Sequence, residues 1–386
     1  MLKKLELQNF KSHRHTKFNF DESRLQAIVG QNSSGKTSVL QALSCLSQLS
    51  ELRLRDFSEY QKEISELITS IGEGNTTIGF NNIVINGDGE NWYFSCELYK
   101  DKIWHKKRAW KVDDRELTDG NIVKAITMDG FLWSNVIDNF LWSNELDFIS
   151  YLKLAVANLS RAAYSEEIVP EIEFDGSGLA PTLDYLRNEY PEQFQSLQIM
   201  LQQIVPSVRR IGTRRAKVDL DRQRLIEVDG QSIVIDDNQE VIGQEIVMDM
   251  ATGDRIPASA ISEGTMLTLG LLTVLVNPQQ PNLVLLDDIE QGLHPKAQRK
   301  LMTVFKQIIE ANPNLQIIFT THSPYIIDEL EPAQVHVLSN SKDGFTHVKR
   351  LDQHPDIEWA KQSLTTGEFW DAEGEDWVIE ADDEND

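Results

Sequence analysis

Cysteine, long apolar runs and positive charge are all scarce in this chain of 386 residues. Its two cysteines, Cys45 and Cys96, lie far apart and outside any C-x-x-C pair, so we interpret both as small buried apolar side chains. No apolar run approaches the ~20 residues that span a bilayer. The N-terminus lacks the apolar segment and cleavage site of a signal peptide. We therefore expect a cytoplasmic protein without a membrane partner.

The charge balance is strongly acidic, with 37 Lys and Arg against 61 Asp and Glu and a net charge of −24. This argues against a protein whose whole surface binds nucleic acid, although it leaves room for a local basic patch. Residues 371–386 hold nine acids and no Lys or Arg. We expect them to form a solvated tail outside the fold. Trp370 and Trp377 beside these acids favour a docking or masking role for the tail.

The first half of the chain predicts strands followed by helices. Alternating apolar and polar residues over 5–20 are typical of a hairpin, and residues 25–29 of a fully buried strand. Residues 76–110 have a strand-like pattern as well. From 121 to 204 the apolar residues recur every three or four positions, which predicts helices that end before Pro206.

The second half predicts short strands and then a regular alternation. Short strand-like runs occur at 224–228, 232–236 and 241–249, separated by turn-forming residues. Helix and strand patterns then alternate, at 261–276 (helix), 283–287 (strand), 296–311 (helix), 316–320 (strand), from 324 (helix) and 334–338 (strand). Such alternation favours an α/β fold whose parallel sheet is covered on both faces. We expect the strand at 25–29 to join this sheet.

Four segments are therefore expected. They are an N-terminal lobe with a β-subdomain (1–120), a mainly helical insertion (121–206), a C-terminal lobe (207–355) and an acidic tail (356–386).

The clearest motif is GQNSSGKTS at residues 30–38, a complete phosphate-binding loop between the predicted strand and a helix-like stretch. A glycine-rich turn at a helix start directs backbone N–H groups toward an anion. Lys36 would reach the β- and γ-phosphates of a nucleotide, and the Thr37 hydroxyl would bind Mg²⁺. The nucleotide-binding residues expected here are Gly30, Asn32, Ser33, Ser34, Gly35, Lys36, Thr37 and Ser38.

Acidic residues follow the predicted strand at 283–287. Ligands of open α/β sheets bind at the carboxyl ends of strands. Asp287 is placed to hold Mg²⁺, and Asp288 to activate a water molecule. Next to them in the predicted sheet, His322 follows the strand at 316–320 and is placed to contact the γ-phosphate or that water. A fourth segment, Ser262–Thr265, opens a helix and is either a second anion site or an ordinary N-cap.

Taken together, these segments resemble the ATP-binding-cassette ATPases of the SMC, RecF and OLD type. The residues that carry the resemblance are the turn NFKSH (9–13), the loop GQNSSGKTS, the segment SEGT (262–265), DDIEQGLHP (287–295) and TTHSP (320–324). The resemblance covers residues 1–350. It implies that ATP and Mg²⁺ are cofactors, with Lys11 in the nucleotide site and Thr37 and Asp287 at the metal.

The resemblance also implies a head-to-tail homodimer, or a higher even oligomer, in which Ser262, Gly264 and Thr265 contact the nucleotide of the other protomer. One position departs from the family pattern: Asp288 stands where these ATPases usually carry Glu. Asp is one methylene shorter, so hydrolysis is expected to be slow, with Glu290 as an alternative or assisting residue.

Two classes of function remain open. One is an ATPase whose dimer controls a partner, either a separately encoded effector, as in phage defence, or DNA, as in RecF and SMC relatives. The other is a nucleotide-regulated structural module with negligible turnover. We favour the effector because the chain has no coiled-coil arm and no nuclease domain after the ATPase. Basic stretches at 100–111 and 209–224 suit DNA, and suit a solvated amphipathic face equally well.

Overall fold

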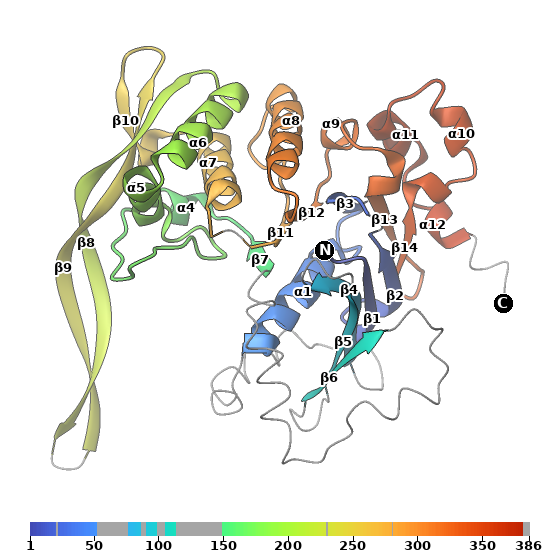
Figure 1. The fold of residues 1–386 in the computed structure, drawn as a ribbon, viewed down its shortest axis with the longest axis horizontal. Coiled ribbons are helices and arrows are strands. Elements are labelled where there is room, and N and C mark those ends of the chain that lie inside the picture. Colours follow the sequence, from blue (N-terminus) through green and yellow to red (C-terminus); the bar gives the residue numbers. More distant parts are fainter. Residues whose placement is uncertain are drawn as a thin grey trace. The chain divides into compact units, whose positions relative to one another are not determined.

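The computed structural model describes most of the chain, in eight stretches: 1–20, 22–51, 76–85, 90–98, 105–112, 149–228, 231–279 and 281–380. The chain forms two compact units (Figure 1). The first contains Met1–Tyr151, Pro281–Glu290 and Phe305–Asp386, and the second contains Leu152–Gln280 and Gln291–Val304. The four segments expected from the sequence stay a prediction. No helix in the described stretches combines the length and apolar character that a membrane crossing requires.

A six-stranded sheet organises the first unit, in the order β14-β13-β3-β12-β11-β7. The strands are β3 (Leu25–Gly30), β7 (Ile149–Leu152), β11 (Leu283–Leu286), β12 (Gln316–Thr320), β13 (Val335–Asn340) and β14 (Thr346–Arg350). The pairs β11–β12, β12–β3 and β3–β13 are parallel, and β14 is antiparallel to β13. Every residue of β3, β11 and β12 is buried, as expected for central strands. The predicted parallel sheet built from both ends of the chain is therefore confirmed.

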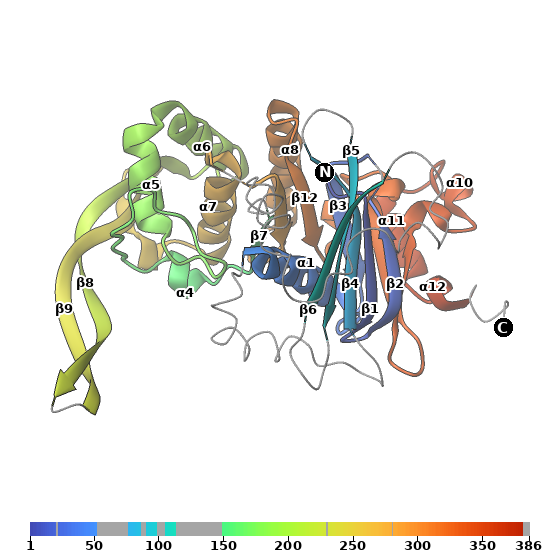
Figure 2. The same ribbon diagram turned by 60° about the horizontal axis from the view of Figure 1, so that its bottom comes forward.

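A second, antiparallel sheet in this unit has the order β2-β1-β4-β5-β6. Its strands are β1 (Lys4–Phe10), β2 (His13–Asn19), β4 (Thr76–Ile85), β5 (Glu90–Leu98) and β6 (His105–Val112), which lie side by side in Figure 2. Helix α1 (Lys36–Glu51) contacts β1 of this sheet and β3 and β12 of the other. Leu5, Leu7 and Phe18, which the alternation placed on one face, form one apolar core with Leu40 and Ile318.

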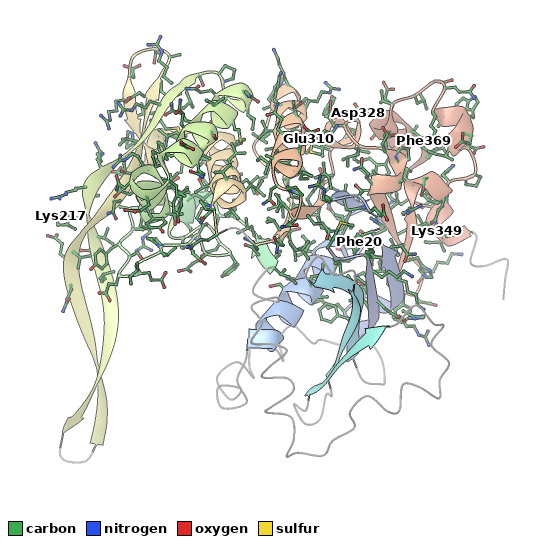
Figure 3. The ribbon with its side chains drawn as sticks, viewed as in Figure 1. Phe20, Lys217, Glu310, Asp328, Lys349 and Phe369 are labelled. Atoms are coloured by element: carbon green, nitrogen blue, oxygen red, sulfur yellow. The ribbon has the colours of Figure 1, made fainter. Side chains whose placement is uncertain are left out.

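The C-terminal residues are folded, so the prediction of a solvated tail from 371 is wrong for residues 371–380. After α9 (Pro324–Ile327), η3 (Pro332–Gln334) and η4 (Leu351–Gln353) come α10 (Ile357–Ala360), α11 (Thr366–Glu373) and α12 (Trp377–Glu380). Phe369 (labelled in Figure 3), Trp370 and Val378 are buried. The ring of His354 packs edge-on against Phe369 and Trp377, with centroids 4.9 and 4.8 Å apart. These apolar contacts outweigh the local acidity; residues 381–386 lie outside the description.

The second unit packs helices against a long β-ribbon. Its helices are α4 (Val156–Leu159), α5 (Leu179–Glu189), α6 (Pro191–Ile204), η2 (Ala258–Ala260) and α7 (Glu263–Val276), and α8 (Pro295–Ala311) begins in it. Its strands are β8 (Val208–Val228), β9 (Gln231–Met250) and β10 (Arg255–Pro257). Helix α7 is buried along nearly its whole length and contacts α4, α5 and α6.

Two sequence expectations in this region require correction. The three short strands expected after 207 are parts of two strands of 21 and 20 residues, which pair without interruption through Asp236 and Asp237 (Figure 1). The helical pattern is confirmed for 179–204, but residues 149–152 form a strand of the six-stranded sheet. The predicted helices between 121 and 148 lie outside the described residues.

Candidate nucleotide-binding site

Residues 30–37, from the last residue of β3 to the first turn of α1, have the backbone of a phosphate cradle. Gly30 has a φ of 145°, and a Cβ there would lie 2.3 Å from the carbonyl oxygen of Leu338. Ser33 and Gly35 have φ values of 66° and 98°, so the chain turns twice through the left-handed region before α1 begins at Lys36. Successive turns of this kind point backbone N–H groups toward a common anion. Asn32 and Ser33 are exposed on this loop, and Ser38 is half-buried in the first turn of α1.

Polar side chains from two strands support the loop. The Thr346 hydroxyl donates to the Ser34 carbonyl at 2.9 Å and contacts the Ser12 hydroxyl at 2.7 Å. His13 Nε2 lies 3.2 Å from the Gly35 carbonyl oxygen. Burial lowers the pKa of His13 to about 4, because the charged ring would lose its water, so the imidazole is neutral at physiological pH. The turn at residues 11–13 therefore supports the loop from behind.

Lys11 lies in the same turn, with a φ of 52°. Its ammonium group donates to the Gln41 side-chain oxygen on α1 and lies 5.9 Å from the centre of the Phe10 ring. Both contacts are to the protein's own framework. Contact of Lys11 with a nucleotide therefore stays a prediction.

Lys36 lies within the cradle and is only 7% exposed. Its Nζ donates to the carbonyl oxygens of Gly30 and Gln31, at 2.9 and 2.8 Å. Burial lowers the pKa of Lys36, and the charges of Asp288, Asp287, Glu375 and Glu290 oppose that shift. The Ser34 hydroxyl is buried and has no hydrogen-bond partner within the described residues. The Lys36 ammonium group and the unpartnered Ser34 hydroxyl lie in one cradle. A cation and a free hydrogen-bond donor together are suited to a phosphate group.

Asp287 joins the loop to the strand edge. The Thr37 hydroxyl lies 3.1 Å from both carboxylate oxygens of Asp287, and the Thr320 hydroxyl donates to one of them at 2.7 Å. Hydroxyl and carboxylate oxygens are hard donors that suit Mg²⁺, which usually binds one or two protein groups together with phosphates and water. The described residues include no cluster of three or more His, Cys, Asp or Glu that could hold a metal. Thr37 and Asp287 thus fit a magnesium ion shared with a nucleotide.

The two acids that follow Asp287 are in different environments. Asp288 is exposed, and its φ of 51° turns the backbone sharply at the strand end, while its N–H donates to the Thr320 hydroxyl at 2.8 Å. Glu290 accepts from the Thr321 hydroxyl and from the backbone N–H of His322, both at 2.7 Å. Because both oxygens of Glu290 are engaged, Asp288 is the better candidate for contact with water. The His322 side chain is exposed at the same edge.

The predicted second anion segment belongs to the second unit. Ser262 is the exposed N-cap of α7, and its hydroxyl lies 2.8 Å from that of Thr265. Gly264 is buried, and a Cβ there would lie 2.2 Å from the carbonyl oxygen of Gly292. Glycine at 264 is therefore required by a close approach of two backbones. The role of these residues toward a nucleotide stays a prediction.

Several residues of the site were not predicted from the sequence. Thr320 and Thr321 directly precede His322, so their place at a strand end could have been predicted. No pattern in the sequence indicates that Glu375 belongs to this site. It is buried and accepts a hydrogen bond from the Gln31 side chain at 3.2 Å, although the two residues are 344 positions apart. Tyr151 also lies at this site, where burial and the charges of Asp287 and Asp288 raise its pKa.

The sequence and the fold match known proteins. A protein family described as “AAA domain, putative AbiEii toxin, Type IV TA system” matches residues 25–328. A “Retron Vc95 probable ATPase” of Vibrio cholerae is 22% identical over 88% of this chain and 73% of its own length. The Septu protein PtuA of Bacillus thuringiensis is 31% identical to this chain over 87 residues. That match covers 22% of this chain and 20% of the relative.

Solved structures of SMC head domains share the fold. An SMC head bound to the C-winged helix domain of ScpA has a TM-score of 0.55 and 16% identity, covering 91% of this chain and 99% of its own. An SMC head with an extended coiled coil, from Pyrococcus furiosus, has a TM-score of 0.54 and 15% identity. The match covers 94% of this chain and 99% of that structure's chain. The chain therefore has an ABC-type ATPase fold in compact form, similar to the SMC, RecF and OLD group.

Proposed function

Because the chain belongs to the family described as “AAA domain, putative AbiEii toxin, Type IV TA system”, we propose that it binds and slowly hydrolyses ATP and that its ATP-bound dimer controls a separately encoded effector protein. The observation that carries the ATP site is the contact of Thr37 with Asp287, beside buried Lys36. It brings the phosphate loop and the acidic strand end into one site. Phosphoryl transfer needs both a phosphate cradle and an acid that holds the metal.

Each group of this site has a proposed role in hydrolysis. Lys36 would leave the carbonyls of its own loop and bind the β- and γ-phosphates. Thr37 and Asp287 would hold Mg²⁺, which neutralises phosphate charge when bound. Asp288 would accept the proton of the attacking water. Glu290 would keep His322 in place through the backbone N–H of that residue, so that its ring can contact the γ-phosphate.

The proposed dimer is carried over from the family resemblance, and the proposed effector is supported by the relatives. Ser262, Gly264 and Thr265 would bind the nucleotide held by the other protomer, as the resemblance implies. The relatives include a protein named as a retron probable ATPase and the Septu protein PtuA. An SMC head of the same fold was solved bound to part of a separate protein, ScpA. We also propose that the protein acts in anti-phage defence, in the cytoplasm.

The test combines nucleotide binding and mass. Isothermal calorimetry with Mg²⁺ and a non-hydrolysable ATP analogue should give binding that Lys36→Ala weakens and the surface variant Lys17→Ala leaves unchanged. Light scattering should show the mass doubling with the analogue, and Ser262→Arg should abolish that doubling. The proposed site fails if Lys36→Ala binds normally. The proposed dimer fails if the mass does not respond to nucleotide.

Binding of DNA is the alternative, and the long ribbon bears on it. Strands β8 and β9 together hold seven basic and eight acidic residues. Arg214 pairs with Glu245 at 2.9 Å, and Lys217, on the ribbon in Figure 3, pairs with Glu240 at 2.6 Å. Cations paired with acids across the ribbon offer little net attraction to phosphate. We therefore keep the effector as the preferred partner.

A nucleotide-regulated module with negligible turnover is the other alternative. Phosphate release by the wild type and by Asp288→Glu, followed over hours, distinguishes it from a slow ATPase. A wild type with no release above the Lys36→Ala background would favour the module.

A further inference from the structure

A long loop of the second unit is held in place near both ends, although it contains no helix or strand. It comprises residues 160–178, between α4 and α5 (Figure 1). Near its start, Ala163 pairs with Gln244 of β9 through two backbone hydrogen bonds, of 2.9 and 2.8 Å. Near its end, the carbonyl oxygen of Phe174 accepts from the N–H of Lys153 at 2.8 Å. Loops of this length without secondary structure are uncommon in compact domains, and those that are held in place usually carry a function.

The side chain of Asp175 fastens the end of this loop. One carboxylate oxygen accepts from the Asn158 side chain at 2.7 Å, and the other accepts from the N–H of Ser177 at 2.9 Å. Gly176 has a φ of 94°, and a Cβ there would lie 2.8 Å from the Leu159 side chain. These residues meet the requirements of a tight, fixed turn. The exposure of the neighbouring side chains is therefore built into the fold.

Two large apolar side chains of the loop are exposed. Ile168 is 92% exposed, and Phe174 is 61% exposed although its backbone is hydrogen-bonded to Lys153. Val169 and Ile172, between them in the sequence, are half-buried. A single exposed apolar residue is ordinary, but several on one fixed loop favour a contact surface for another molecule.

The charged residues of the loop are all acids, which limits what can bind there. Residues 162–178 include no Lys, Arg or His, and their acids are Glu166, Glu167, Glu171, Glu173 and Asp175. Glu167, Glu171 and Glu173 are exposed and make no ion pair with the described residues. They would repel the phosphates of nucleic acids and the anionic lipids of a membrane surface. The same loop of a second copy would meet like charges. A cationic protein segment with apolar side chains is complementary both to the acids and to the apolar residues.

We propose that loop 160–178 is the docking surface for the effector, and that it binds a segment rich in Lys or Arg and in apolar side chains. This inference rests on the proposed effector and names the surface and the chemistry of that contact. Ile168 and Phe174 would be covered by apolar side chains of the partner, and the exposed acids around them would pair with its cations. Burial of the apolar anchors contributes most of the affinity, and the surrounding charges contribute specificity and faster association.

The test is fluorescence anisotropy of a labelled peptide rich in Lys and Leu, titrated with the full chain in the absence of nucleotide. A counterpart peptide with Glu in place of Lys is the control for charge. Wild-type protein should bind the Lys peptide and not the Glu peptide. Ile168→Ser combined with Phe174→Ser should weaken that binding by about tenfold or more. Ile199→Ser, at an exposed position of α6 in the same unit, is the matched control and should leave the binding unchanged. The melting temperature should stay the same in these variants, because the altered side chains are exposed.

A second pair of variants tests the acids. Glu171→Gln combined with Glu173→Gln should weaken binding of the Lys peptide by about threefold or more, and the loss should shrink at high salt, because exposed charges are screened. Glu189→Gln combined with Glu192→Gln alters two exposed acids of α5 and α6. This control should bind the peptide as the wild type does.

Several results would each overturn the proposal. No binding of the Lys peptide, or equal binding by the wild type and by Ile168→Ser with Phe174→Ser, would show that the loop is not the contact. An equal loss in the control variants would indicate non-specific adhesion to an acidic protein. Equal binding of the Glu peptide, or no loss in Glu171→Gln with Glu173→Gln, would refute the charge complementarity.

Light scattering of the free protein tests the remaining occupant. Self-association without nucleotide that Ile168→Ser with Phe174→Ser abolishes would make a second copy the occupant and would overturn the proposal. None of these measurements uses ATP. A failure of the ATP site in calorimetry would refute the proposed ATPase and would be distinguishable from a failure of the docking surface.

Discussion

Removal of one buried charge at Glu375 should strengthen ATP binding. The carboxylate of Glu375 lies between α11 and α12, is 9% exposed, and accepts from the side chain of Gln31 in the phosphate loop. It is also one of four acids whose charge acts on Lys36. A carboxylate in that position attracts the lysine and repels the phosphates that the lysine is placed to bind. Glu375→Gln keeps the shape and a polar partner for Gln31, and removes only the charge.

The size of the effect follows from Coulomb's law. At an effective dielectric constant of about 20, two unit charges about 8 Å apart interact by about 2 kcal/mol. The nucleotide carries several negative charges, but bound Mg²⁺ and Lys36 cancel part of them. We therefore expect a net gain of about 1.4 kcal/mol, which corresponds to about tenfold tighter binding.

The assay is calorimetric titration with Mg²⁺ and a non-hydrolysable ATP analogue at two ionic strengths. Asp371→Asn, on an exposed position of the same segment, is the matched control and should leave the affinity unchanged. The gain should persist at higher salt, because a buried charge is screened less than a surface charge. If Glu375→Gln binds the analogue no more tightly than the wild type, while its melting temperature is unchanged, the electrostatic reasoning is refuted.

Three further predictions concern the site and its support. Lys36→Ala removes a charge-assisted contact of about 1.5–3 kcal/mol, so calorimetry should show at least about tenfold weaker ATP binding; equal affinity would refute the phosphate-loop assignment. Burial lowers the pKa of His13 and His336 to about 4, below the unfolded value of 6.5. The unfolded state therefore binds more protons between these pH values, and the free energy of unfolding should fall as the pH is lowered from 6.5 to 4. Urea unfolding should show a smaller fall for His13→Gln, and an identical pH dependence would contradict this origin. Phe369→Ala should lower the free energy of unfolding by about 3–5 kcal/mol; a loss below about 1 kcal/mol would mean that α11 is not part of the core.

The sequence predicted β3, β11, β12 and β13 of the six-stranded sheet well because each is a short apolar run with a distinct end, whereas β7 and β14 were not predicted as strands. Residues 25–29, 283–287 and 316–320 could be assigned by period and length alone. Thr37 and Asp287 could then be brought together, since ligands of such sheets gather at the carboxyl ends of strands. The 3.1 Å contact between them agrees with that reasoning.

Other parts of the fold could not be predicted because long-range contacts decide them. The acids of residues 371–380 favour solvent, but burial of Phe369, Trp370 and Val378 contributes more than those charges cost. The ribbon looked like three short strands because Asp236-Asp237 resembles a turn, whereas cross-strand pairing continues through it. Glu375 and Tyr151 join the site only through the fold, and no local pattern marks either of them.

The charges around the loop explain how one site can keep a buried lysine and still admit a nucleotide. Behind the loop, the supporting groups are neutral: a histidine whose pKa is about 4 and the hydroxyls of Ser12 and Thr346. The charges that act on Lys36 belong to Asp287, Asp288, Glu290 and Glu375. These acids favour the charged form of the lysine, which burial alone would disfavour. They also oppose the phosphates, and the Mg²⁺ that we propose on Thr37 and Asp287 would offset that repulsion when ATP binds.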